Sequence, residues 1–150
     1  MEIQSTRFGT LTLSNELMLH FSEGLPGFSE EKQFVFLKDD FESPFAYLQS
    51  VQDKDLTLLL VDPFSFFKHY SFELEEALME QLNVSEDKPP HVYSIVKVPE
   101  KAEEMTTNLT APIVINWEKQ IATQVILDKS PYSKNQRLFP FGLPKVGGKK

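Results

Sequence analysis

The chain has 150 residues and a mass of 17.3 kDa, the usual size of a single globular domain. It is 41% hydrophobic and 25% charged, a composition that excludes intrinsic disorder and fibrous proteins. The absence of Cys excludes thiol nucleophiles, disulfides and Cys-ligated metal sites. The first residues do not resemble a secretion signal, and no apolar run approaches the roughly 20 residues that cross a bilayer. We therefore expect a cytoplasmic protein that makes no contact with a membrane.

The net charge of −7 is distributed unevenly along the chain. Residues 1–128 contain all 22 Asp and Glu against 9 Lys and Arg, which gives −13, whereas residues 129–150 contain six basic residues and no acid. An acidic surface repels phosphate groups and attracts basic surfaces. We therefore expect no direct nucleic-acid ligand, and the acidic charge favours either a basic protein partner or simply solubility.

Taken in chain order, most of the apolar residues recur with a period of two, which predicts β-strands. The predicted strands cover residues 10–13, 17–21, 34–37, 45–51, 56–61, 70–74, 92–98, 113–117 and 121–127. One helix is predicted at residues 75–82, where Leu78 and Leu82 lie four residues apart, and a second short turn at residues 100–105. This pattern predicts a mainly β fold, a small antiparallel β-barrel-like single domain with one or two short helices. The domain is expected to cover residues 1–133, followed by a basic and flexible C-terminal tail at residues 134–150.

Residues that would support catalysis or metal binding do not form recognisable patterns. The three His residues are isolated from one another, and the chain contains no nucleophile elbow, phosphate-binding loop or dinucleotide-binding glycine motif. Closely spaced acids such as Asp53 and Asp55 are expected by chance in loops of so acidic a chain. We expect no catalytic residue, no metal and no cofactor, and retain one alternative, a small cytoplasmic hydrolase-type enzyme that uses loop carboxylates.

Two turns carry large apolar residues where polar ones are usual. They are residues 24–28, Gly-Leu-Pro-Gly-Phe, and residues 62–67, Asp-Pro-Phe-Ser-Phe-Phe. These side chains either plug the ends of a barrel or form an exposed apolar patch with an acidic rim, which is typical of a protein-binding surface. On the second interpretation the candidate partner-binding residues are Glu23, Leu25, Phe28, Asp62, Phe64, Phe66, Phe67 and Glu73.

Four blocks of sequence, in this order, resemble the FliW family of bacterial flagellar assembly factors. They are residues 23–28, 43–51, 62–67 and 105–116, the last reading Met-Thr-Thr-Asn-Leu-Thr-Ala-Pro-Ile-Val-Ile-Asn. The resemblance covers about residues 1–133. The chain departs from the family pattern between Trp117 and Ile121, where it has no Gly for a tight hairpin, and in its C-terminal extension.

The resemblance implies a small antiparallel β-barrel and a cytoplasmic function without catalysis. It implies two protein partners: newly made flagellin, and CsrA, a small basic RNA-binding dimer that represses translation of flagellin mRNA. Capture of CsrA when flagellin is scarce would relieve that repression, and accumulated flagellin would displace CsrA by competition. We expect the acidic charge to attract CsrA and the apolar patch to receive the terminal segments of flagellin.

Overall fold

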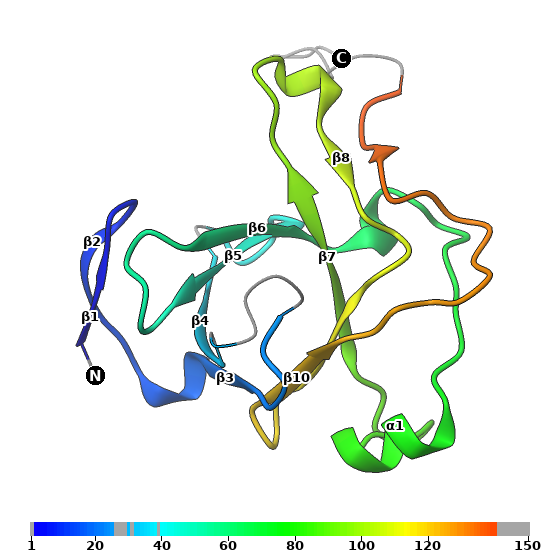
Figure 1. The fold of residues 1–150 in the computed structure, drawn as a ribbon, viewed down its shortest axis with the longest axis horizontal. Helices are drawn as coiled ribbons and strands as arrows, with labels where there is room; N and C mark the ends of the chain where they lie inside the picture. The colour runs from blue at the N-terminus through cyan, green and yellow to red at the C-terminus, as the bar shows by residue number, and fades with distance from the viewer. Residues whose placement is uncertain (1, 26–29, 31, 39, 141–150) are drawn as a thin grey trace.

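A computed structural model of the chain describes residues 2–25, 30, 32–38 and 40–140 (Figure 1). In this part of the chain no helix is both long and apolar enough to cross a membrane. The strands and the α-helix are β1 (Glu2–Ser5), β2 (Gly9–Thr12), β3 (Met18–Phe21), β4 (Gln33–Leu37), β5 (Phe45–Ser50), β6 (Thr57–Val61), α1 (Glu76–Leu82), β7 (His91–Lys97), β8 (Thr106–Thr107), β9 (Ile113–Asn116), β10 (Ile121–Gln124) and β11 (Gln136–Arg137). Three short 3-10 turns lie at Asn15–Leu17, Pro63–Ser65 and Ala102–Glu104.

Seven of these strands close into a barrel. Neighbours pair in the order β7-β6-β5-β4-β3-β10-β9, and β9 pairs with β7 to close the ring. All of these pairs are antiparallel except β3 and β10, which run parallel. The predicted fold class, a mainly β barrel-like domain with one or two short helices, is thereby confirmed.

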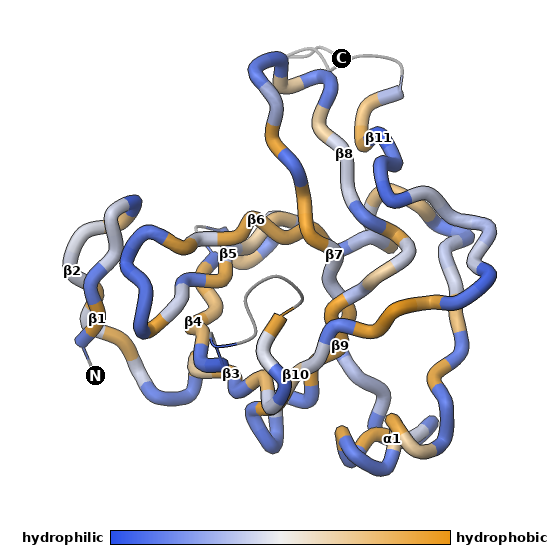
Figure 2. The backbone as a smooth tube through the Cα atoms, viewed as in Figure 1, coloured by the Kyte–Doolittle hydropathy of each residue, from blue (hydrophilic) through white to orange (hydrophobic). Residues whose placement is uncertain are grey.

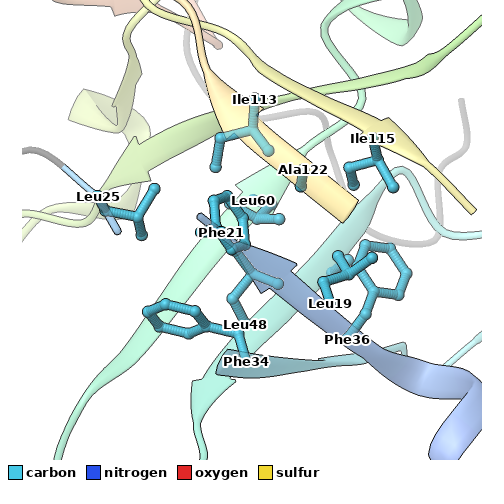
Figure 3. Close-up of a cluster of buried hydrophobic side chains, with 11 residues drawn as sticks. Leu19, Phe21, Leu25, Phe34, Phe36, Leu48, Leu60, Ile113, Ile115 and Ala122 are labelled. Atoms are coloured by element: carbon cyan, nitrogen blue, oxygen red, sulfur yellow. The ribbon is translucent and has the colours of Figure 1, made fainter. Parts of the chain in front are cut away.

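The barrel is filled by a cluster of buried apolar side chains from β3, β4, β5, β6, β9 and β10 (Figure 3). Phe21 and Phe34 are both fully buried and meet edge to face, with their ring centroids 5.5 Å apart. Along the backbone the apolar residues concentrate in the barrel strands, as the hydropathy colours show (Figure 2). Alternate residues of the barrel strands therefore point inward and form the core, as the sequence pattern predicted.

One buried polar side chain fastens the β1–β2 hairpin to the barrel. Gln49 is fully buried, and its Oε1 atom accepts hydrogen bonds from the hydroxyls of Ser5 and Thr57. Its Nε2 atom donates to the carbonyls of Ser50 and Asp53, both at 3.2 Å. Gln49 thus satisfies polar groups from three separate segments.

We expect Gln49→Leu to lower the free energy of unfolding by about 2 kcal/mol, because it leaves buried hydroxyls and carbonyls without partners. Urea unfolding followed by circular dichroism measures the change. The matched control is Gln52→Leu, at an exposed loop position, for which we expect a change below about 0.5 kcal/mol. Equal effects of the two substitutions would contradict the assigned role of Gln49.

The turn between β9 and β10 achieves a tight reversal without glycine. Gln120 adopts a left-handed conformation with φ of 56°. Its side-chain amide donates to the carbonyls of Asn15 and Met18, at 2.7 and 2.9 Å. These bonds stabilise Gln120 in a left-handed conformation that most residues other than Gly avoid. The tight turn therefore forms although the sequence has no Gly at this turn.

The predicted strand at residues 70–74 is wrong. This segment is extended, and its side chains alternate between buried or half-buried (Tyr70, Phe72, Leu74) and exposed (Ser71, Glu73), but it pairs with no strand among the residues that the structure describes. Alternation indicates only that one face of a segment is covered. Here Phe72 and Leu74 pack against Leu82, Val84 and Val114, and Tyr70 packs against Tyr132, without any strand pairing.

The C-terminal residues that the structure describes pack on the domain. β11 pairs with β8, and Leu138, which is buried, donates its N–H to the carbonyl of Met105 at 3.1 Å. Phe139 meets Phe66 edge to face at 5.7 Å. Residues 136–139 are thus part of the folded body, and the expectation of a flexible tail stays a prediction for residues 141–150, which lie outside the described residues.

Candidate functional site

A groove with an acidic rim lies on one side of the barrel. One wall is formed by residues 71–75 and α1, the other by residues 123–132, and Glu23 lies at its edge. Its volume is about 690 Å³. The two walls are about 50 residues apart in sequence, and the barrel topology brings them to the same side of the molecule (Figure 1). We call this feature the acidic groove.

The acidic groove combines negative charge with apolar surface. Four acidic residues and one basic residue line it, and all four acids are exposed: Glu23, Glu73, Glu75 and Asp128, with Lys129 as the base. Apolar surface comes from half-buried Phe72 and Leu78 and from Ile126, which is 62% exposed. Such a surface suits a partner that carries both apolar and basic groups.

Two tyrosines hold the wall of the groove in place. The Tyr70 hydroxyl donates to the carbonyl of Leu109 at 2.8 Å, and its ring contacts that of Tyr132 with centroids 4.7 Å apart. The Tyr132 hydroxyl in turn accepts the N–H of Ser71 at 3.0 Å. Through these contacts an extended segment that belongs to no sheet keeps a defined position.

Burial raises the pKa of Tyr70 well above its usual value of about 10, and the nearby Tyr132 raises it further. The folded protein therefore holds this proton more tightly than the unfolded chain does, so the stabilisation is complete below pH ~10 and is lost as the pH rises above it. We expect unfolding free energies measured in urea to fall as the pH rises above about 10. The free energy of unfolding of Tyr70→Phe should fall less steeply over this range of pH. An identical slope for the two proteins would contradict the raised pKa of Tyr70.

A second groove, of about 570 Å³, also borders this extended segment and is lined by residues 70–74. Phe64 lines it, is 43% exposed, and lies 5.6 Å from Tyr70 between ring centroids. Glu73 lines both grooves. Three predicted site residues therefore lie in or beside the same extended segment: Glu73 belongs to it, and Glu23 and Phe64 line the grooves that border it.

The other predicted site residues lie elsewhere. Leu25 is only 2% exposed and belongs to the barrel core (Figure 3), which corrects the expectation that it is part of an exposed patch. Phe66 and Phe67 are half-buried and pack on the outer side of the barrel against Val61. Phe28 lies outside the described residues.

Asp62 has a local structural role. Its carboxylate accepts the N–H of Phe64 at 3.0 Å and so caps the 3-10 turn at Pro63–Ser65. Its charge also faces Tyr93, whose pKa is raised by burial and then by this negative charge. The 62–67 turn therefore packs Phe66 and Phe67 on a cluster separate from the barrel core and leaves Phe64 exposed, which matches neither interpretation of the sequence in full.

Sequence reasoning missed the 123–132 wall, including Ile126. The apolar residues of segment 121–127 predicted a strand there, but such a pattern does not indicate which of the side chains remains exposed. Two more exposed apolar residues, Phe41 and Val98, lie away from the acidic groove. In the described ranges no group of three His, Asp or Glu is placed to hold a metal ion.

Comparisons with known proteins agree on one family. The profile of the family described as FliW protein matches residues 2–138. The chain is 50% identical over 139 residues to the flagellar assembly factor FliW of Desulfitobacterium hafniense (strain Y51), covering 93% of this chain and 91% of that protein. It is 43% identical to the protein of the same name from Anoxybacillus flavithermus, covering 93% and 96% of the two chains. A crystal structure of the flagellar assembly factor FliW superposes with a TM-score of 0.85 at 38% identity, covering 93% of this chain and 98% of that one. The chain belongs to the FliW family.

Proposed function

We propose that this protein acts in flagellar assembly as a non-enzymatic cytoplasmic regulator that binds flagellin and captures the repressor CsrA. Capture of CsrA relieves repression of flagellin mRNA, and flagellin reverses it by competing for the protein. Membership of a family whose members are named flagellar assembly factors supports the assembly role. The acidic groove is the observation that carries the binding proposal, because it offers apolar surface and negative charge together.

Electrostatics favours a basic partner such as CsrA. Residues 1–128 carry a net charge of −13, and Glu23, Glu73, Glu75 and Asp128 concentrate part of it at the groove. Complementary charge raises the association rate and makes binding weaken as salt screens it. CsrA binding should therefore be strongly salt-dependent.

Flagellin would rely more on apolar contact. Phe64 and Ile126 are exposed, and Phe72 lies half-buried between the two grooves. Terminal segments that have not yet found their own partners can bury apolar side chains in such grooves. A shared groove also supplies the physical basis for competition, since one occupant excludes the other.

The enzyme alternative receives less support from the same geometry. A catalytic carboxylate is usually desolvated in an enclosed pocket, where burial adjusts its pKa. The four acids of the acidic groove are instead exposed to solvent. Binding is therefore the function we propose for them.

Calorimetric titration of the purified protein with CsrA, and separately with flagellin, tests the proposal. At about 50 mM salt we expect saturable binding of both, and at about 500 mM salt a loss of CsrA affinity that is at least tenfold and exceeds the loss for flagellin. Circular dichroism at both salt concentrations controls for folding. Absence of binding by a folded sample to either protein would overturn the proposal.

A further inference from the structure

We propose that the acidic groove binds an extended segment of a partner protein by β-strand addition at Ile126. This inference rests on the proposed function in one respect, that the groove serves a protein partner. The segment we infer alternates apolar residues with Lys or Arg. Three observations carry the inference: an open backbone edge, a facing wall that is also extended and unpaired, and the charge of the rim.

The open edge continues from β10. β10 pairs with β9 along one edge and with β3 along the other, but the β3 pairing covers only Ile121 and Ala122. Beyond β10 the antiparallel bonding continues on the first edge, where Val125 donates its N–H to Pro112 and Leu127 donates to Thr110, both at 2.8 Å.

The backbone N–H and C=O of Ile126 therefore point away from β9, toward the opposite edge of the strand. In antiparallel pairing, alternate residues direct N–H and C=O to opposite edges of the strand. Within the part of the chain that the structure describes, the N–H and C=O of Ile126 form no hydrogen bond with another residue. An unpaired edge of this kind is the template on which an added strand forms.

This edge faces the acidic groove. Glu23 follows the end of β3 by two residues and lines the groove together with residues 123–130, so the groove occupies the side that β3 leaves uncovered. The facing wall, residues 72–74, is also extended, and its backbone N–H and C=O groups form no hydrogen bond with other described residues. Two extended stretches of chain thus border one groove.

The side chains that line the acidic groove indicate which residues the bound segment must carry. An added strand directs successive side chains to opposite faces, so every second residue can pack on Phe72, Leu78 and Ile126. The residues between them then lie near the acidic rim, where four carboxylates outnumber the single lysine. A segment that alternates apolar and basic residues satisfies both conditions, and an acidic segment satisfies neither.

The test uses a synthetic peptide, acetyl-Lys-Val-Lys-Val-Lys-Val-Lys-amide, carrying a fluorophore for anisotropy measurements. There are two control peptides. In the first, every Lys is replaced by Glu. In the second, the backbone nitrogens of alternate residues are methylated, so that one edge of the peptide cannot donate hydrogen bonds. On the protein side, Ile126→Pro removes the unpaired N–H, which supports no bond within the described chain, and Ile126→Ala keeps it. Circular dichroism confirms that each variant is folded.

We expect saturable binding of the Lys peptide, at least tenfold weaker binding to Ile126→Pro, and less than threefold weakening by Ile126→Ala. The methylated and Glu peptides should also bind at least tenfold more weakly. Equal binding of the methylated peptide would overturn strand addition without requiring any change to the protein. Binding that appears only in a chain ending at Pro140 would make residues 141–150 the occupant and overturn the assignment to a partner.

Parallel titrations with CsrA and flagellin separate this inference from the proposed function. If both proteins bind the wild type and the Lys peptide does not, strand addition fails and the proposed function stands. If neither protein binds, the proposed function fails. A dimer of this chain that Ile126→Pro abolishes would assign the edge to a second copy and would also overturn the inference.

Discussion

Phe34→Ala is expected to lower the free energy of unfolding by about 4 kcal/mol. Phe34 is fully buried, meets Phe21 edge to face, and belongs to the cluster that fills the barrel (Figure 3). Truncation removes the apolar transfer energy of the ring and leaves a cavity that the closed ring of strands can collapse only in part. Urea unfolding at constant temperature measures the loss.

The matched control is Phe41→Ala. Phe41 is 91% exposed, so its truncation should change the free energy of unfolding by less than about 0.5 kcal/mol. Similar losses for the two substitutions would mean that Phe34 is not part of a closely packed core.

Reversing two charges of the acidic groove is expected to weaken CsrA binding by about 100-fold at low salt. The variant Glu23→Lys/Glu73→Lys changes one carboxylate beside β3 and one on the extended wall, both exposed and both lining the groove. At both positions of the groove it replaces attraction for a basic partner by repulsion. Calorimetric titration with CsrA at about 50 mM salt measures the change.

A second double variant separates local from overall charge. Glu100→Lys/Glu104→Lys makes the same change in net charge at exposed positions that do not line the acidic groove. We expect it to weaken CsrA binding less than fivefold. Equal weakening by the two variants would show that CsrA responds to the net charge of the protein and not to the groove.

Local sequence patterns predicted most of the barrel strands because the apolar pattern of a strand depends only on residues that are close together in the sequence. The core strands β3 to β7, β9 and β10, and the helix ending at Leu82, were all predicted from local apolar patterns. Residues 70–74 show the limit of this reasoning. The alternation is present, but whether an extended segment pairs with a strand depends on distant residues. Here Tyr132 packs on Tyr70, and Phe72 and Leu74 pack on a cluster that includes Val114 of β9, without strand pairing.

The candidate site could be predicted only in part, for a related reason. Composition and turn chemistry indicated Glu23, Phe64 and Glu73, which line the two grooves along one extended segment. The same reasoning grouped Leu25 with the phenylalanines, although Leu25 points into the core. Exposure depends on which side of the barrel each turn reaches. That information comes from strand order, including the parallel pairing of β3 with β10, which no local pattern indicates.

Competition between the two partners tests the central claim most directly. A complex of the purified protein with fluorescent CsrA is titrated with unlabelled flagellin, and CsrA release is followed by anisotropy and by size-exclusion chromatography. The account predicts that flagellin displaces CsrA from the protein and that Glu23→Lys/Glu73→Lys fails to form the starting complex, whereas Glu100→Lys/Glu104→Lys forms it. A stable complex containing all three proteins, with no release of CsrA at saturating flagellin, would contradict it.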